Sequence, residues 1–121
     1  MKQKKTLVLG ASGNPSRYSH LAIQRLRSHG HPVVAIGRRV ARVADTNIVT
    51  QKEQVDDIDT VTLYMNEKHQ QEFQDYILSL KPKRIIFNPG AENDKLAELA
   101  RAQGIQTMEA CTLVMLSTNQ Y

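Results

Sequence analysis

The stretch LGASGNPSR, residues 9–17, follows directly on the short apolar run Thr6 to Leu9 and changes the character of the chain. It holds two glycines, two serines, an asparagine, a proline and an arginine. The run before it is short, apolar and bounded by polar residues, as expected of a strand covered on both faces. The stretch therefore predicts a sharp turn at the carboxyl end of a buried first strand, of the kind that often holds a phosphate.

Apolar strands and amphipathic helices alternate along the rest of the chain. A helix is expected from Tyr18 to His29, with Ser19 as its N-cap and Gly30 as its stop. Further strands are expected at 32–37, 47–49, 60–65, 84–87 and 105–108, and further helices after Asn66, before Gly104 and over 113–116. This order predicts an α/β fold, a single Rossmann-like three-layer domain over residues 1–121 with a mostly parallel sheet of five or six strands and helices on both faces.

The first loop has the features of a phosphate-binding turn. In an open parallel sheet, ligands bind beyond the carboxyl ends of the strands, beside strand one. A helix that starts there offers unpaired N–H groups and the positive end of its dipole. Gly10 and Gly13 let the backbone approach a ligand, Ser12 and Ser16 offer hydroxyls, and Arg17 offers a charge. The alternative is that these residues only shape a turn and cap a helix.

Composition excludes several other classes of protein. The 121 residues include 16 basic and 12 acidic side chains, a formal charge of +4, which favours an anionic partner. Arg38, Arg39 and Arg42 form the densest basic cluster, within a polar connection. Cys111 is the only cysteine, so neither an internal disulfide nor a thiolate-rich metal site can form. No run approaches the roughly 18 apolar residues of a membrane span, and we expect a cytoplasmic protein that binds no metal.

The order of several short motifs resembles the small stand-alone CoA-binding proteins, whose fold is that of the CoA-binding domain of the succinyl-CoA synthetase alpha chain. The resemblance covers roughly residues 5–116. The motifs are VLGAS at 8–12 with Pro15 and Arg17, HGHPVV at 29–34, IDTV at 58–61, NPG at 88–90 with Asn93, and EAC at 109–111. Gly37-Arg38 replaces the Asn-Pro that is usual in related chains, and EACT at 109–112 replaces a sequence close to Asp-Arg-Cys-Pro.

The resemblance implies a set of ligand contacts in four loops. Gly10, Ser12 and Arg17 would hold the CoA diphosphate, with Asn14 nearby. The other implied contacts are Gly37 and Arg38 at the adenosine end, Met65 and Asn66 beside the ligand, and Asn88 and Gly90 on the far side of the cleft, with Asn93 at the next helix start.

Three functions are compatible with these residues. The first is a non-catalytic module that binds CoA or an acyl-CoA, since no catalytic group is evident. The alternative is an NADP-binding reductase-like protein, because the spacing of Gly10 and Gly13 is close to that of some NADP-binding loops, although Ser16 replaces the third glycine. The third is nucleic-acid binding, which we do not expect because the aromatic-and-basic pattern of single-strand binders is absent. The sequence leaves a homodimer open, and it leaves open whether Cys111 is a small buried side chain or meets a ligand thiol.

Overall fold

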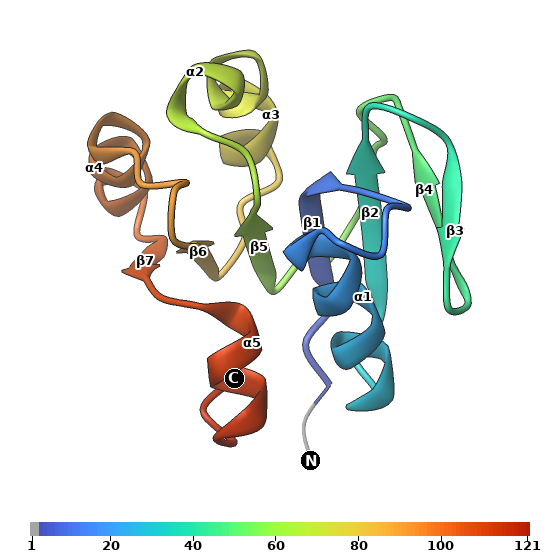
Figure 1. Ribbon diagram of the computed structural model, residues 1–121. Coiled ribbons are helices and arrows are strands. Elements are labelled where there is room, and N and C mark those ends of the chain that lie inside the picture. The colour runs from blue at the N-terminus through green and yellow to red at the C-terminus, as the bar shows by residue number, and fades with distance from the viewer. Residues whose placement is uncertain (1–2) are drawn as a thin grey trace.

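The computed structural model describes residues 3–121 of the chain, in which strands and helices alternate (Figure 1). The elements are β1 (Thr6–Ala11), α1 (Tyr18–Ser28), β2 (Val33–Gly37), β3 (Ala41–Val43), β4 (Thr46–Val49), β5 (Thr60–Leu63), α2 (Glu67–Gln70), η1 (Gln71–Phe73), α3 (Gln74–Ser79), β6 (Arg84–Phe87), α4 (Asp94–Ala102), β7 (Gln106–Glu109) and α5 (Thr112–Ser117). Within residues 3–121, no helix has both the length and the apolar character that crossing a membrane requires.

All strands within residues 3–121 belong to one sheet, in the order β3-β4-β2-β1-β5-β6-β7. Neighbouring strands are parallel except β3 and β4, which are antiparallel. The chain goes from β1 to β2 on one side and later to β5 on the other, so the strand order reverses at β1. The carboxyl ends of β2 and β5 point to the upper edge of Figure 1. Such a reversal opens a crevice beyond the central strand, where open α/β sheets bind their ligands.

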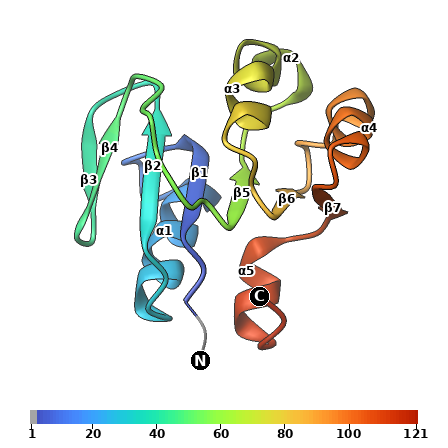
Figure 2. The same ribbon diagram turned by 180° about the vertical axis from the view of Figure 1, so that it is seen from behind.

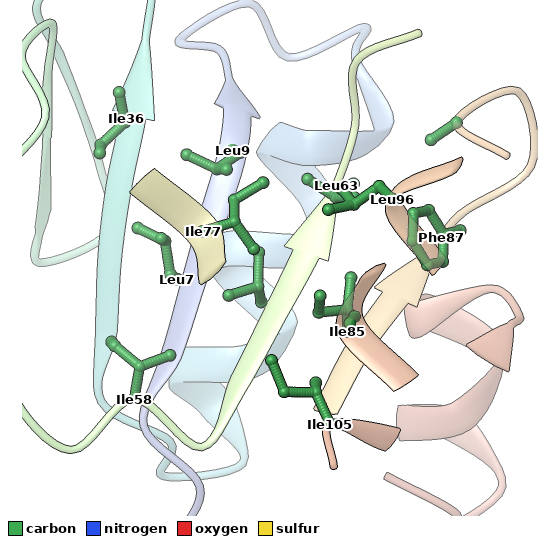
Figure 3. Close-up of a cluster of buried hydrophobic side chains, with 13 residues drawn as sticks. Leu7, Leu9, Ile36, Ile58, Leu63, Ile77, Ile85, Phe87, Leu96 and Ile105 are labelled. Atoms are coloured by element: carbon green, nitrogen blue, oxygen red, sulfur yellow. The ribbon is translucent and has the colours of Figure 1, made fainter. Parts of the chain in front are cut away.

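Side chains of β1 alternate between two apolar layers, one on each face of the sheet. Leu7 and Leu9 lie in the layer that contains Ile77 of α3 and Leu96 of α4 (Figure 3). Val8 lies in the other layer, with residues of α1 and α5. Accordingly, α1 lies in front of the sheet in Figure 1 and behind it in Figure 2. Each fully buried leucine or isoleucine contributes roughly 1.5–3 kcal/mol, so both layers hold β1 firmly and fix where its loop begins.

The sheet has seven strands, whereas the sequence pattern predicts five or six, and β3 is the strand that the pattern misses. Ala41–Val43 pairs antiparallel with Thr46–Val49 through a two-residue turn in which Ala44 has a φ of 54°. Only Val43 of the three β3 residues is buried, so an edge strand this short leaves little periodicity to detect. Arg42 therefore lies in a strand and not in a polar connection.

The turn of this hairpin is attached to α1 by an ion pair. Arg27 of α1 donates from Nε and Nη2 to the two carboxylate oxygens of Asp45, each at 2.8 Å. The hydrogen bonds from Arg27 lower the pKa of Asp45 to about 2. The pair lies at the surface, so we assign it a positional role.

Helix starts follow the sequence prediction at two places and differ at a third. Asn66 and Asn93 cap α2 and α4, their side chains accepting hydrogen bonds from the backbone N–H groups of His69 and Leu96. The prediction that Ser19 caps the first helix is wrong, because α1 begins one residue earlier and Ser19 is buried within it. The N-cap is Arg17, whose side chain makes no capping hydrogen bond. The first turn of α1 therefore has no side-chain cap, and the helix buries Ala22, Ile23 and Leu26.

The segment after α5 returns to the amino-terminal end of β1. Tyr121 places its hydroxyl oxygen 2.6 Å from Thr6 Oγ1, and its ring centroid lies 4.3 Å from Cζ of the buried Arg84. The ring also lies 5.0 Å from that of His31, and Lys4 Nζ donates to the backbone oxygen of Tyr121. The start of the described chain, before β1, and its carboxyl end consequently lie on the same side of the molecule (Figure 1).

Candidate functional site at the carboxyl edge of the sheet

Gly10 is the next-to-last residue of β1, just before the loop to α1, and has a φ of +86°. A Cβ atom at this position would lie 2.8 Å from the backbone oxygen of Tyr64. Glycine alone adopts a positive φ readily and leaves room for so close an approach. Gly10 therefore joins the carboxyl ends of β1 and β5, and the loop rises from this junction.

Hydrogen bonds within the loop hold its shape. Ser12 Oγ accepts from the backbone N–H of Asn14 at 3.0 Å. Asn14 Oδ1 accepts from the backbone N–H of Ser16 at 3.0 Å and from its hydroxyl at 2.9 Å. The backbone oxygen of Asn14 accepts from Arg17 N at 3.0 Å. Asn14 is thus the organising residue of the loop, while the hydroxyl hydrogen of Ser12, which acts here as an acceptor, is available to another group.

The amino end of α1 carries positive charge that no acidic neighbour in its first turn offsets. The first turn contains no Asp or Glu, and the N-cap residue Arg17 has an exposed side chain. The helix dipole and the first N–H groups favour an anion at this position. This end of α1 and the loop before it therefore form a surface suited to a phosphate.

The carboxyl end of β2 comes very close to the end of β1. A Cβ atom at Gly37 would lie only 2.2 Å from the backbone oxygen of Ala11, so no other residue fits without a shift of the strands. Arg38 follows, with an exposed side chain whose Nη2 lies 2.9 Å from Nε2 of His69 in α2. The sequence analysis did not select His69, and the structure brings it to Arg38 from 31 residues away.

The loop after β5 contains Met65 and Asn66, and both are tied to α2. Asn66 Oδ1 accepts from the backbone N–H of His69 at 3.0 Å, so this side chain caps the helix. The half-buried Met65 offers its backbone oxygen to Gln70 Nε2 at 2.8 Å. Both residues lie beyond the carboxyl end of β5, and their contact with a ligand stays a prediction.

Gln70 is fully buried, and the sequence analysis missed it. Besides the bond to Met65, its Nε2 donates to the backbone oxygen of Ala91 at 2.7 Å, and its Oε1 accepts from Asn93 Nδ2 at 2.9 Å. One side chain thus connects the loop after β5 to the loop after β6. In the sequence, Gln70 stands three residues before Phe73 and seven before Ile77. This helical spacing places a polar residue on the apolar face, and it is the signal that could have identified Gln70.

The side chain of Asn88 lies beneath the site and is buried. Its Nδ2 donates to Thr62 Oγ1 at 2.7 Å and to the backbone oxygen of Leu63 at 2.8 Å. Its Oδ1 accepts from the backbone N–H of Thr112 at 2.9 Å. Asn88 therefore joins β5, β6 and α5 through these three bonds of its side chain. Gly90 is exposed two residues further on, with a φ of +90°.

A small polar cluster lies behind this asparagine. The hydroxyls of Thr62 and Thr112 are 2.7 Å apart. The hydroxyl of Tyr64 is buried without a hydrogen-bond partner, and burial raises the pKa of Tyr64 above its usual range. Cys111 is half-buried and is the N-cap of α5, where its side chain makes no capping hydrogen bond. Nothing in this arrangement assigns a reaction to the thiol.

Eight of the ten predicted ligand residues fall into three groups. Ser12, Arg17 and Arg38 present polar side chains at the surface or near it. The side chains of Asn14, Asn66 and Asn88 hold the loops together. Gly10 and Gly37 permit close approach of the strands. No group of three His, Cys, Asp or Glu side chains in residues 3–121 is placed to hold a metal ion.

Two hollows lie at the opposite, amino-terminal edge of the sheet and contain none of the predicted ligand residues. One, of about 320 Å³, lies between α1 and the hairpin and includes Arg27 and Asp45. The other, of about 650 Å³, includes Lys5, Lys81 and Lys83 together with Asp57 and Asp59. The mixed charges of this hollow indicate no particular ligand. The carboxyl edge of the sheet, in contrast, contains arginine side chains, glycines and the start of α1.

Comparison with known families identifies the family of the chain. Residues 4–117 match the model of a family described as a CoA binding domain. The chain belongs to this CoA-binding family. Membership accounts for the α/β fold and supports binding of CoA in general. No curated protein matches the chain.

Solved structures of similar proteins share the fold of the family member described here. One, a crystal structure of an uncharacterized protein, is 46% identical, with a TM-score of 0.96 and complete coverage of both chains. A hypothetical protein from Pyrococcus horikoshii OT3 is 20% identical, with a TM-score of 0.86 over 97% of this chain and 84% of that one. A protein from Thermus thermophilus is 19% identical, with a TM-score of 0.85 over 98% and 91%. The last two show the fold alone.

Proposed function

We propose that this chain binds CoA or an acyl-CoA, with the diphosphate on the loop at residues 10–17, and that it does so without catalysing a reaction. The observation that carries the proposal is the start of α1, where no side chain caps the helix and Arg17 is exposed beside a glycine-containing loop. That loop lies where the strand order reverses. Membership of a CoA-binding family supports the choice of ligand.

The proposed roles follow the chemistry of each side chain. Arg17 makes charge-assisted hydrogen bonds to the diphosphate, and the hydroxyl of Ser12 and the backbone near Gly10 add further donors. Asn14 keeps the loop in shape. Gly37 lets the loop after β2 approach β1, and Arg38 meets the phosphate on the ribose.

The pantetheine end extends toward the loops after β5 and β6. Met65 and Asn66 flank it on one side, and the backbone at Asn88 and Gly90 lies on the other. Gln70 fixes the distance between these two loops through its bonds to Met65 and Ala91. No acid, base or nucleophile is assigned, and the proposed partner is a small nucleotide and not a nucleic acid.

Titration calorimetry with CoA, dephospho-CoA and NADPH in one buffer tests the proposal. The purified chain should bind CoA more tightly than NADPH. Arg17→Ala should weaken CoA and dephospho-CoA alike, by about tenfold or more, because both ligands keep the diphosphate and a hydrogen bond to a charged group contributes about 1.5–3 kcal/mol. Arg25→Ala, a change at an exposed position in the last turn of the same helix, is the matched control and should leave both affinities unchanged.

The outcomes separate the candidate ligands. A preference for NADPH would show that the ligand of this loop is NADP and not CoA. Equal losses of affinity in Arg17→Ala and Arg25→Ala would show that the diphosphate does not bind at the start of α1. No binding of any nucleotide would mean that this chain retains the fold of its family without the ligand.

A further inference from the structure

The loop after β2 and helix α2 meet beyond the carboxyl end of β1, through the contact between Arg38 and His69. The strands before them, β2 and β5, lie on either side of β1. Nη2 of Arg38 and Nε2 of His69 are 2.9 Å apart, and both side chains are exposed. The contact therefore crosses the end of the strand from which the loop at residues 10–17 rises.

Neither Arg38 nor His69 forms an ion pair with an acidic side chain in the part of the chain that the structure describes. A guanidinium has only donors, so His69 Nε2 must be the acceptor. Both side chains are basic, and the only ion pair within residues 3–121 is the one between Arg27 and Asp45. Two neighbouring basic groups without a carboxylate are better satisfied by an anion that accepts a hydrogen bond from each of them.

The backbone holds His69 in this position. Its N–H donates to Asn66 Oδ1, which fixes the first turn of α2 at the end of β5. The buried Gln70 follows directly and anchors the same turn to the loops after β5 and β6. His69 is thus an exposed imidazole on a fixed backbone, with only its side chain free to turn toward a ligand.

We propose that Arg38 and His69 together bind the phosphate monoester on the ribose of the nucleotide. This inference rests on the proposed function, since it assumes that the diphosphate lies on residues 10–17. A phosphate monoester has three strong acceptor oxygens, enough for two hydrogen bonds from the guanidinium and one from the imidazole. On binding, each side chain donates to the phosphate instead of contacting the other, and His69 carries its hydrogen on Nε2.

Two nucleotides present such a group, the 3′-phosphate of CoA and the 2′-phosphate of NADPH. For each there is an otherwise identical nucleotide without this phosphate: dephospho-CoA for CoA, and NADH for NADPH. The ratio of affinities within each pair isolates the contribution of the phosphate, because the rest of the ligand is the same. The pair that shows the larger ratio identifies the source of the phosphate.

The experiment measures both ratios by titration calorimetry for the wild type and three variants. His69→Ala should lower the preference for the phosphorylated ligand by about tenfold and leave the affinity for the other ligand unchanged. His69→Gln should recover part of the preference, because its amide can still donate. Lys68→Ala, which removes a full charge from the neighbouring exposed residue, is the control for general electrostatic attraction and should change the ratio by less than twofold.

Several results would overturn the inference. If His69→Ala keeps the wild-type ratio, or if Lys68→Ala lowers it equally, His69 is not a ligand of the phosphate. If the wild type binds CoA and dephospho-CoA equally, and NADPH and NADH equally, the ribose phosphate contributes nothing to binding. That result contradicts this inference and leaves the proposed diphosphate site unaffected. If the wild type binds none of the four, the proposed function fails and this inference fails with it.

Discussion

The amide nitrogen of Gln70 donates a hydrogen bond to the backbone oxygen of Ala91 at 2.7 Å, across the space between α2 and the loop after β6. The same nitrogen also donates to Met65, and the amide oxygen accepts from Asn93. Every partner lies in a loop or at a helix start beyond the carboxyl ends of the strands. The spacing of the two loops therefore depends on a single buried side chain.

Gln70→Leu should strongly destabilise the protein. Leucine fills a similar volume but leaves the backbone oxygens of Met65 and Ala91 and the amide of Asn93 without this partner. A buried polar group without a partner costs roughly 1–3 kcal/mol, so we expect the free energy of unfolding to fall by about 2–4 kcal/mol in urea denaturation. Gln71→Leu, at the exposed next position, should change it by less than about 0.5 kcal/mol. Equal effects of both substitutions would show that the network is not stabilising.

Gly10→Ala and Gly104→Ala form a matched pair that measures the close contact between β1 and β5. Both glycines have a positive φ, +86° and +80°, so alanine is strained to a similar degree at either position. A Cβ at Gly104 meets no atom within 4 Å, whereas at Gly10 it meets the backbone of Tyr64 at 2.8 Å. Gly104→Ala should cost about 1–2 kcal/mol in the free energy of unfolding, and Gly10→Ala about 1–3 kcal/mol more. Equal costs would mean that the strands separate easily at this junction.

Stability should depend on pH through His31. Burial, followed by the charges of His29, Lys4 and Arg84, lowers the pKa of this imidazole, and its Nδ1 accepts a hydrogen bond from the backbone N–H of Lys4. Because the unfolded chain then binds the proton more tightly than the folded chain, the free energy of unfolding falls as the pH drops below about 6.5, the ordinary histidine value, toward the lowered one. The loss is complete once the pH is below both values.

Urea denaturation between pH 7.5 and pH 5 measures this dependence. His31→Gln should make the curve flatter over that range, while it lowers stability at pH 7.5 through the lost packing against Tyr121. His29→Gln, two residues earlier and with its Nδ1 near an exposed backbone oxygen, is the control and should keep most of the slope. A slope that is unchanged in His31→Gln would assign the pH dependence to other groups.

Tyr121 should contribute to stability through both its ring and its hydroxyl. Tyr121→Phe removes the contact with Thr6 and should cost about 1 kcal/mol in the free energy of unfolding. Tyr121→Ala also uncovers the buried guanidinium of Arg84 and should cost about 3–5 kcal/mol, as for other large-to-small changes of aromatic residues. If the two variants lose the same amount, the ring contributes nothing and the segment after α5 is not part of the core.

Much of the fold is predictable because the central strands are short, buried and rich in apolar and β-branched residues. The runs at β1, β2, β5 and β6 are recognisable without knowledge of tertiary structure, since each is short, apolar and followed by turn residues. The strand at Ala41–Val43 was missed because its pairing with β4 contributes one buried side chain only. The Ser19 cap was wrong because a serine in the first turn of a helix has the same sequence signal whether it lies before the helix or inside it.

The loops of the candidate site were predictable from strand order, but the tasks of their side chains were not. Asn14, Asn66 and Asn88 were selected as ligand contacts, and their side chains hold backbone together. The role of Gln70 and the approach of His69 to Arg38 depend on residues far apart in sequence, which no local pattern records. Whether the ten predicted ligand residues contact CoA remains a prediction for the titrations above.

The bond from Thr112 to Asn88 bears on how the chain folds during synthesis. Helix α5 has six residues, too few to be stable alone, and the N–H of its first residue is bound to an asparagine that follows β6. The hydroxyl of Tyr121, beyond that helix, in turn lies beside Thr6 in the first strand. Until residues 112–121 have been synthesised, the apolar residues of β1 and α1 that pack with Leu116 therefore lack this cover, so the strands of the sheet can pair before this face is closed.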